Sequence, residues 1–570
     1  MPVTPTYPGV YVEEVPSSVH TIMGVPTSVA AFVGYAARGL VDTPVQVNSW
    51  ADYERAFGGL DSTSPMSYAV FLYFLNGGNA AQIVRASATD GTGTPASIAL
   101  SSDTILVATS PGTWGNRLSA TVDTNGLVNK AELFTLTITL SDDNKNPLTT
   151  ESYTGLSLTA GAVGTAGTPI GTAITTALAS SALMNVEPSS VLTVAPVAGT
   201  YTVPTPANPA AAAKAASAPK TAADAPAGDA PAADAAPSPA APAAPAAAAA
   251  PAAAGATGPT PGPGTDMNVS QLAVPGDQGN KTGVYALVKA DIFNMLCLPS
   301  TWPQTYSADI LGQAATFCQQ QRAMLIVDPP STWPGGPQAV TFETVVGALP
   351  VAPPDVANAA IYYPNLVLPD PVTGATMQLG PCGAIAGVWA STDDARGVWK
   401  APAGTAAGIG GISDLAVHID DGESGVLNPI GVNCLRTLPL IGPVSWGART
   451  AAGADELASP WKYISVRRTA LFIEESLRRG TQWVVFEPND EPLWSSVRLN
   501  VGAFMNSLFK QGAFQGSTPA DAYLVQCDAD NNPQSSINQG ILNILVGFQP
   551  LLPAEFVIIQ IQQLTGQLQG

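Results

Sequence analysis

Between residues 461 and 528, hydrophobic positions follow helical spacing twice and form two strand-like runs. The first helical stripe has steps of 4, 3 and 4 residues and consists of Val466, Ala470, Ile473 and Leu477, before Gly480. The second stripe ends before Gly512 and consists of Leu493, Val497, Val501, Phe504 and Leu508. The runs TQWVVFEP (481–488) and AYLVQCD (522–528) are typical of short strands. This order predicts a compact helix–strand–helix–strand module.

Near the end of the chain, two prolines precede an alternating apolar run in NQGILNILVGFQPLLPAEFVIIQIQQ (538–563). Pro550 and Pro553 have no N–H to donate to a sheet ladder, so strand pairing must restart after them. Beyond these prolines, side chains alternate between two faces: Val557, Ile559 and Ile561 on one, and Phe556, Ile558 and Gln560 on the other. We expect a strand with at least one buried face; an ordinary C-terminal edge strand is the alternative.

Several phrases, in this order along the chain, resemble the contractile phage tail sheath protein family, which includes sheath subunits of phage tails and of phage-derived contractile injection systems. The most specific phrase is WVVFEPNDEPLW (483–494). The others are YPGVYVEEV, GVPTSVAAFVGYA, VNSWADYERAFGGL, FLNGGNAAQIVRA, SPGTWGNRLSATVD, DDARGVWKAPAG and NCLRTLPLIGPVSWGART. The closing stretch, NQGILNILVGFQPLLPAEFVIIQIQQ, resembles the family's two closing strands around a P-A-E-F turn. Because these phrases are colinear, the resemblance covers nearly the whole chain except roughly residues 204–266.

A chain of 570 residues is too long for one hydrophobic core, so several domains are expected. The predicted fold class is multidomain α/β and α+β. It has an α/β core, a β-sandwich-like insertion, a disordered Ala/Pro linker and an α+β C-terminal domain; the resemblance implies that the terminal strands are exchanged and that the insertion faces outward. The predicted segments are an N-terminal arm (1–20), the N-terminal part of the core (21–94), the β-rich outward-facing insertion (95–203), the linker (204–266), the α/β domain (267–442), the C-terminal domain (443–554) and a C-terminal strand or arm (555–570).

Three of these assignments rest on local patterns. Alternating runs such as FTLTITL in a Thr/Ser/Gly-rich stretch favour the β-rich insertion. Buried strand candidates such as AMLIVDP, alternating with helix candidates, favour a mostly parallel sheet after residue 267; a further helix is expected at Tyr68–Leu75. In the Ala/Pro segment, frequent prolines prevent a continuous helix and alanine gives too little side chain for a core. We expect that segment to form a hydrated, weakly acidic brush; a docking tether is the competing interpretation.

Composition excludes several function classes. Only 11% of residues are charged, whereas about 25% is typical, which leaves weakly charged surfaces such as an assembling subunit would have. The net charge is -20, so the chain lacks the basic surface of a nucleic-acid binder. The N-terminus MPVTPTYPGV does not resemble a secretory signal, and no apolar run predicts a membrane span. The cysteines are odd in number, scattered and without CxxC spacing, which predicts reduced core thiols in a protein made in the cytoplasm: Cys297, Cys318, Cys382, Cys434 and Cys527.

Catalysis finds little support in the sequence. The chain has two histidines; His20 lies in the predicted arm, and His418 precedes Ser424, but Val426 replaces the last glycine of a nucleophile elbow. We therefore interpret His418 as structural or exposed. The acidic cluster around it lacks calcium-loop spacing and favours a solvated loop: Asp414, Asp420, Asp421 and Glu423.

The segment GDQGNKTG (276–283) fails as a phosphate loop, because Asn280 replaces the glycine before Lys281. A turn before the helix candidate VYALVKA is the better interpretation. We predict no catalytic residue, no cofactor and no metal site.

The resemblance implies a structural subunit that polymerises helically around an inner tube and contracts to drive the tube through a target cell envelope. It implies a non-catalytic, subtilisin-like α/β domain and a C-terminal domain facing the tube. The implied partners are other copies in hexameric rings, the inner tube protein, and the baseplate and terminator or cap proteins, without nucleic acid or membrane insertion. The implied location is the bacterial cytoplasm during assembly, then a phage tail or a phage-tail-like particle. The alternatives are a hydrolase on the α/β domain and a monomeric surface or adhesion module.

In the family, terminal arms of neighbouring subunits add strands to a third subunit's sheet. The matching residues here are Val10, Tyr11, Val12, Phe556, Val557, Ile558, Ile559 and Ile561. The implied candidates for tube contact are Arg467, Arg468, Arg478 and Arg479. The alternative for the second pair is intrahelical ion pairing, Glu474 with Arg478 and Glu475 with Arg479, at the i,i+4 spacing.

Overall fold

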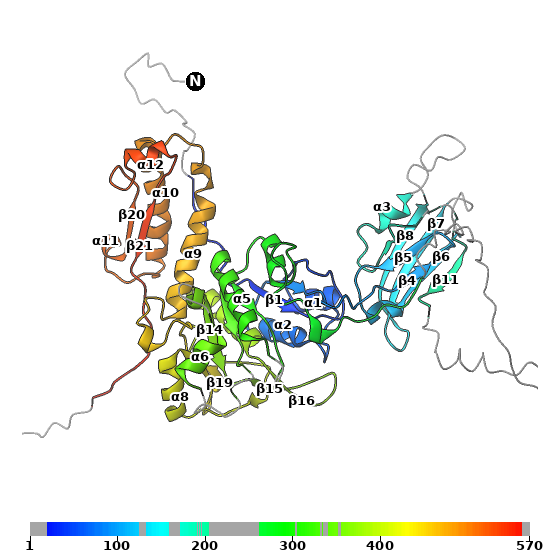
Figure 1. Cartoon of the computed structure of the whole chain (residues 1–570), viewed down its shortest axis with the longest axis horizontal. Coiled ribbons are helices and arrows are strands. Elements are labelled where there is room, and N and C mark those ends of the chain that lie inside the picture. Colours follow the sequence, from blue (N-terminus) through cyan, green and yellow to red (C-terminus); the bar gives the residue numbers. More distant parts are fainter. Residues whose placement is uncertain are drawn as a thin grey trace, which may run out of the picture. The chain divides into compact units, whose positions relative to one another are not determined.

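The computed structural model describes residues 20–124, 133–158, 172–190, 192, 194, 196–204, 261–301, 305–330, 333, 340–350 and 355–560. The chain divides into two compact units (Figure 1). One combines the segments up to Gly91 and from Asn268 onward, and the other extends from Thr92 to Met267. The expected arm residues Val10, Tyr11, Val12 and Ile561, and most of the Ala/Pro segment, lie outside the described residues.

The first unit is built on an eight-stranded sheet, whose strand order is β19-β18-β14-β13-β12-β1-β3-β2. Six of its strands run parallel: β1 (Ala30–Gly34), β3 (Ala81–Arg85), β12 (Met295–Cys297), β13 (Met324–Val327), β14 (Ala359–Tyr363) and β18 (Val432–Leu438). The two edge strands are antiparallel to their neighbours: β2 (Val45–Val47) and β19 (Gly442–Ser445). The expected mixed α/β fold is confirmed, and the segments 21–94 and 267–442 both contribute strands to this one sheet.

Both faces of this sheet are buried, as expected for parallel strands connected by helices. Along β1, Phe32 faces one apolar core and Val33 faces the other. Helices α2 (Pro65–Leu75) and α7 (Cys382–Arg396) contribute to the core on the Phe32 face. On the Val33 face the covering elements are α5 (Ala308–Gln321), α6 (Phe342–Ala348) and the 3-10 helix η3 (Gly283–Lys289).

Smaller elements complete this part of the first unit. Helix α1 (Trp50–Phe57) packs its buried Tyr53 and Phe57 on the first core. A three-stranded antiparallel sheet contains β15 (Leu366–Pro369), β16 (Thr376–Leu379) and β17 (Asp414–Leu415). Helix α8 (Asp421–Leu427) follows, and short 3-10 helices are η2 (Val269–Gln271), η5 (Asp355–Asn358), η6 (Asn428–Ile430) and η7 (Asp455–Leu457).

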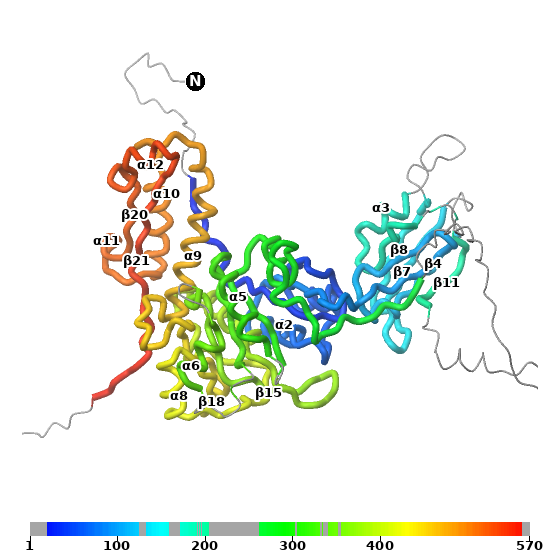
Figure 2. The backbone as a smooth tube through the Cα atoms, in the orientation of Figure 1, coloured from blue at the N-terminus to red at the C-terminus, as the bar shows by residue number. Residues whose placement is uncertain are grey.

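The C-terminal part of this unit contains α9 (Ile464–Gly480) and α10 (Glu491–Lys510), the two helices that the apolar stripes predict. A two-stranded antiparallel sheet, β20 (Tyr523–Gln526) and β21 (Leu545–Phe548), lies with them, together with α11 (Pro519–Ala522) and α12 (Gln534–Asn538) (Figure 2). The expected strand at 481–488 is wrong. Its place is taken by the 3-10 helix η8 (Gln482–Val484), where Trp483 stacks on His20 with ring centroids 4.1 Å apart.

The second unit is β-rich and has its own apolar core. A five-stranded sheet contains β11 (Gly199–Thr202), β6 (Leu118–Asp123), β7 (Phe134–Ser141), β8 (Pro147–Ser157) and β9 (Thr172–Ala173). A three-stranded sheet contains β10 (Met184–Val186), β5 (Ile105–Ala108) and β4 (Ser97–Ala99), and the remaining elements are η1 (Thr113–Arg117) and α3 (Ile174–Leu178). The strict alternation of buried positions along β7 is the pattern that FTLTITL predicts.

One predicted boundary is wrong in this unit. Residues 261–266 are not part of a linker, because they return to the unit and pair with its first residues. Thr94 and Thr265 form an antiparallel bridge, and Ser97 N–H donates to the Gly262 carbonyl at 2.9 Å. The close packing also requires Gly264, where a Cβ atom would lie 2.4 Å from the Gly112 oxygen.

Candidate assembly site

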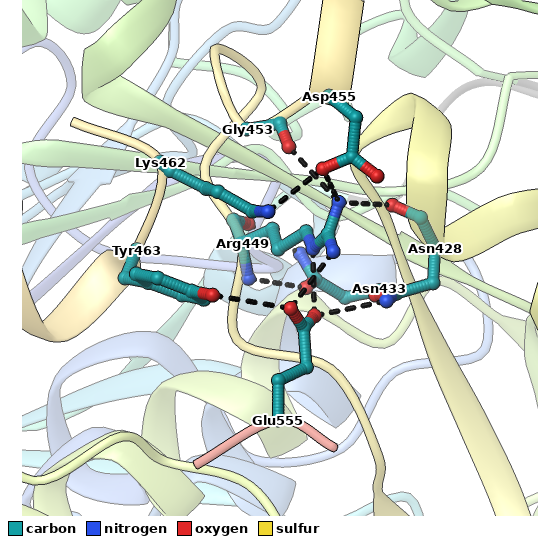
Figure 3. Close-up of polar contacts among 8 residues, drawn as sticks. All are labelled: Asn428, Asn433, Arg449, Gly453, Asp455, Lys462, Tyr463 and Glu555. Carbon is teal, nitrogen blue, oxygen red and sulfur yellow. Dashed lines mark hydrogen bonds and ion pairs between the residues drawn. The ribbon is translucent and has the colours of Figure 1, made fainter. Parts of the chain in front are cut away.

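A buried arginine, Arg449, binds Glu555 and so joins the start of the C-terminal segment to the rest of the first unit (Figure 3). Arg449 lies between β19 and α9, and its Nε and Nη2 donate to the two carboxylate oxygens of Glu555 at 2.7 and 2.8 Å. Its Nη1 donates to Asp455 at 2.9 Å and to the Asn428 and Gly453 carbonyls. We call Arg449, with the groups that surround Glu555, the arginine socket.

Two further donors complete the hydrogen bonding of Glu555: Asn428 Nδ2 at 2.9 Å and Tyr463 Oη at 3.1 Å. The Arg449 side chain is 1% exposed and that of Glu555 is 19% exposed. Burial acts to raise the pKa of Glu555, but the hydrogen bonds from Arg449 and Asn428 outweigh it and lower the pKa below its ordinary value. The socket therefore favours an ionised carboxylate at this position.

Beyond Glu555, the chain exposes consecutive apolar side chains. Phe556, Val557, Ile558 and Ile559 are 74%, 79%, 84% and 80% exposed. Residues 551–560 belong to no helix or strand of the single chain. The expected strand with a buried face is therefore not formed within one chain, because no neighbouring strand among the described residues pairs with it.

A second unpaired surface lies in the same C-terminal part. The sheet of β20 and β21 has two strands, and no further strand among the described residues occupies either of its edges. Leu524 and Leu545 on these strands are about half exposed. Two-stranded sheets have little stability of their own, and unpaired edges accept added strands.

The expectation of tube contact is wrong for Arg467 and Arg468, because both side chains are buried within the chain. Arg468 donates to the two carboxylate oxygens of Asp393 at 2.8 and 2.6 Å and lies over the Trp389 ring. Arg467 donates to Asn358 Oδ1 and lies over the Trp461 ring. These two arginines join α9 to the α/β core.

Arg478 and Arg479 are partly exposed, but both bind Glu475, at 2.6 and 2.7 Å. Arg479 also binds Asp291 at 3.1 Å. The expected pair of Glu475 with Arg479 is present, whereas Glu474 pairs with Arg467 and not with Arg478. A role of Arg478 and Arg479 toward a partner remains a proposal, since each is already engaged within the chain.

Neither histidine that was considered for catalysis forms a hydrogen bond with a serine among the described residues. His418 is 67% exposed and pairs with Asp414 at 3.3 Å, while His20 stacks on Trp483. The acidic cluster is not a loop throughout: Asp420 caps α8, and Asp421 and Glu423 lie in its first turn. In the described part of the chain, no group of His, Cys, Asp and Glu side chains has the geometry of a metal site, and the five cysteines are buried and free.

One buried carboxyl lies at the carboxyl end of the parallel strands. Asp328 follows β13 and accepts hydrogen bonds from Cys382 N–H at 2.8 Å, at the start of α7, and from Ser300 Oγ at 3.3 Å. Burial raises the pKa of Asp328 to about 7, although these hydrogen bonds oppose the rise. Gly380 permits this packing, because a Cβ atom there would lie 2.0 Å from the carboxylate.

This group predicts a pH dependence of stability. Because the folded-state pKa is above the ordinary value of 3.8, the folded protein binds a proton that the unfolded chain has lost, and stability falls as pH rises between these values. The steepest loss is about 1.4 kcal/mol per pH unit. We expect Asp328→Asn to flatten the dependence of the unfolding midpoint on pH between 4 and 7. An unchanged slope in that variant would contradict the assignment.

Sequence reasoning missed the arginine socket and the Arg468–Asp393 pair. Neither has a periodic signal, because their members lie 106 and 75 residues apart. The only hint was that the phrases GART and PAEF, which contain Arg449 and Glu555, both occur in stretches that resemble the sheath family.

Comparisons with known proteins agree with that resemblance. Residues 456–563 match the family model of the phage tail sheath C-terminal domain. The tail sheath protein of Vibrio phage KVP40 is 29% identical over 178 residues, which are 31% of this chain and 25% of that protein. That of Burkholderia phage BcepMu is 29% identical over 195 residues, which are 34% of this chain and 39% of that protein. The matches thus span about a quarter to two fifths of these relatives.

Solved structures show the same fold. The contracted helical sheath of the anti-feeding prophage has a TM-score of 0.52 at 21% identity, covering 98% of this chain and 100% of that one. The contracted PVC sheath complex has a TM-score of 0.52 at 20% identity, covering 98% of each chain. A sheath tail protein from Listeria innocua has a TM-score of 0.54 at 14% identity, covering 90% of each. The resemblance to contractile sheath proteins is confirmed, and no helix of the described residues is long and apolar enough to cross a membrane.

Proposed function

We propose, from the premise that residues 456–563 are a phage tail sheath C-terminal domain, that this chain is a structural subunit of a contractile sheath. The observation that carries the proposal is the run from Phe556 to Ile559, which lies in this same domain and exposes four apolar side chains to solvent. A monomeric protein gains nothing from such a run, whereas an assembling subunit buries it against a neighbour.

The mode of assembly follows from the unpaired strands. A donated segment gains backbone hydrogen bonds from a sheet edge and alternate side-chain contacts on its faces. The two-stranded β20–β21 sheet of a neighbouring copy offers such edges, and the donated segments are the C-terminal run and the N-terminal arm around Val10, Tyr11 and Val12. Heterologous contacts of this kind generate a helical polymer when the rotation between neighbouring copies does not close a ring.

Contraction is then a rigid-body reorientation of linked subunits from a metastable extended state, without nucleotide consumption by this chain. The partners in this proposal are other copies of the chain, an inner tube, a baseplate and a terminator. The proposed setting is assembly in a bacterial cytoplasm, followed by incorporation in a phage tail or a phage-tail-like particle.

Purified chain is expected to form hollow tubes that negative-stain microscopy detects. Removing residues 1–15, or removing residues 557–570, is expected to leave folded subunits that sediment as monomers. The second deletion starts after Phe556 so that Glu555 keeps its bonds to Arg449. Ordered tubes from either truncated chain would contradict strand exchange for that arm, and a monodisperse full-length monomer would contradict the sheath proposal and favour a surface module.

A further inference from the structure

A polar cavity of about 560 Å³ lies at the amino end of the eight-stranded sheet. Its walls include the segments that lead into three neighbouring parallel strands: residues 25–29 before β1, residues 79–80 before β3 and residues 291–292 before β12. Because parallel strands begin at the same edge of a sheet, these three segments meet there. Two further elements complete the cavity: the edge strand β2, through Gln46, and the last turn of α7, through Asp394.

Hydrogen bonds hold the walls of this cavity in place. The hydroxyl of Tyr73 lies 2.7 Å from the carbonyl oxygens of both Ser28 and Ala80, and so joins the segment before β1 to the segment before β3. Val29 N–H donates to Asn294 Oδ1 at 3.0 Å, which joins the same segment to the one before β12. The cavity is therefore formed before a ligand binds, and binding requires little further ordering of the chain.

Two buried polar side chains face the cavity without a hydrogen-bond partner in the described part of the chain. They are those of Gln82 and Ser28, which are 6% and 7% exposed and line the cavity. Gln46 is the direct neighbour of Gln82 in the ladder between β2 and β3, so the two carboxamides lie on the same face of the sheet. Buried polar groups require hydrogen bonds, which here must come from water or from a ligand.

The cavity carries one carboxylate that no cation neutralises. Asp394 takes part in none of the ion pairs among the described residues, and Asn79 Nδ2 donates to it at 3.2 Å. Asp291 also lines the cavity, but Arg479 binds it at 3.1 Å. Asp394 lies in the last turn of α7, where the helix dipole favours a cation, and Arg396 of the same turn lines a different cavity.

The unused hydrogen-bonding groups of the cavity are mostly acceptors. Four side-chain oxygens on its walls accept no hydrogen bond within the described part of the chain: Oδ1 of Asp394, Oδ1 of Asn79, Oε1 of Gln46 and Oε1 of Gln82. A cation with several N–H donors matches this set. An ammonium group has three donors, whereas a guanidinium has five in a planar fork that also fits a carboxylate. Four acceptors therefore favour the guanidinium.

We propose that this cavity binds a guanidinium group, with Asp394 as its charged partner and the carboxamides of Gln46 and Gln82 as further acceptors. The guanidinium belongs either to a small free compound or to an arginine side chain of a neighbouring copy, and the two sources share this chemistry. The binding chemistry does not depend on the proposed sheath function.

Calorimetric titration of the full-length chain with L-argininamide tests the site, and L-lysinamide is the matched cation of equal charge. L-argininamide is expected to saturate one site per chain with a Kd of about 1 mM or lower, the strength expected of so small a ligand. L-lysinamide is expected to bind at least about fivefold more weakly, because an ammonium has fewer donors. Equal affinity for the two compounds, or no saturable binding of L-argininamide, would overturn the assignment.

Removing the carboxylate separates specific binding from general attraction to a chain of net charge -20. Asp394→Asn is expected to weaken the binding of L-argininamide at least about tenfold, and Gln46→Ala about threefold. Both side chains are exposed, so both variants are expected to fold, which thermal unfolding checks. The matched control is Glu343→Gln, which removes an exposed carboxylate on α6 and is expected to leave binding unchanged. An unchanged affinity in Asp394→Asn, or an equal loss in the control, would contradict the proposed site.

The source of the guanidinium is identified with the same variant. If it is an arginine of a neighbouring copy, Asp394→Asn is expected to lower the yield of tubes, and L-argininamide is expected to inhibit assembly of the wild-type chain. If it is a free compound, both chains are expected to form tubes equally, and mass spectrometry is expected to detect the compound with the purified wild-type chain but not with Asp394→Asn. Equal tubes without such a compound would show that the site has no natural guanidinium ligand and would overturn the proposal.

Discussion

Replacing Asp393 with alanine is expected to lower the free energy of unfolding of the first unit by about 3–5 kcal/mol. Asp393 and Arg468 are 2% and 4% exposed, and two hydrogen bonds of 2.8 and 2.6 Å join them. Without the carboxylate, the guanidinium of Arg468 stays buried between α7 and α9 with one remaining acceptor, the Thr27 carbonyl. A buried charge that loses its partner costs much more than the pair contributes when intact.

The measurement is chemical denaturation followed by a signal confined to the first unit, because the chain has two compact units and need not unfold in one step. Glu491→Ala is the matched control, since Glu491 pairs with Arg498 but is 60% exposed, and its loss is expected to cost less than about 1 kcal/mol. Asp393→Leu combined with Arg468→Met is expected to recover most of the loss, because no unpaired charge remains. A loss below about 1 kcal/mol for Asp393→Ala would contradict the assignment.

Variants that test inner-tube binding must leave Arg468 unchanged. Reversing all four arginines of α9 would unfold the chain through Arg468, and the loss of co-assembly would then carry no information about the tube. Arg478→Glu with Arg479→Glu avoids this problem, because both side chains are partly exposed. Even that pair releases Glu475, so folding must be checked before co-assembly is interpreted.

The sequence predicted those parts of the fold that depend on local pattern. The stripes in α9 and α10 and the alternation in β7 are repeated over many residues, and one buried face determines each of them. The run at 481–488 was misread because its apolar residues have no strand partner: Phe486 has a left-handed φ of 73° and is fully exposed. In a sequence, a short apolar run looks the same whether it forms a buried strand or an exposed turn.

Burial of charged residues is the property that the sequence could not reveal. In the sequence, Arg467 and Arg468 look like surface residues, since they lie outside the apolar stripe of α9. They are buried because that side of α9 packs on the α/β core, where Asn358 accepts from Arg467 and Asp393 accepts from Arg468. Those partners lie 109 and 75 residues upstream, and no local pattern connects them. The same reason hid the pairing of Arg449 with Glu555.

The arginine socket predicts that Glu555 contributes to stability and positions the C-terminal run, and that the two effects can be separated. In a chain that ends at Phe556, we expect nearly full stability but no polymerisation. Adding Glu555→Ala to that chain is expected to lower the free energy of unfolding by a further amount of about 2–3 kcal/mol. The loss is smaller than for Asp393, because Asp455 and two backbone carbonyls still accept from Arg449.

The pH dependence distinguishes an ion pair from simple packing. Because the folded-state pKa of Glu555 lies below its ordinary value of 4.5, its contribution is complete above that value and is lost as pH falls through the lowered pKa. The stability difference between the two truncated chains should therefore be constant near neutral pH and shrink below about pH 4. A difference that stays constant down to pH 2 would mean that Glu555 acts through packing alone.

In full-length tubes, the same carboxylate fixes where the exposed run from Phe556 leaves the subunit. Glu555→Ala is therefore expected to reduce assembly even at neutral pH, where the arm itself is intact.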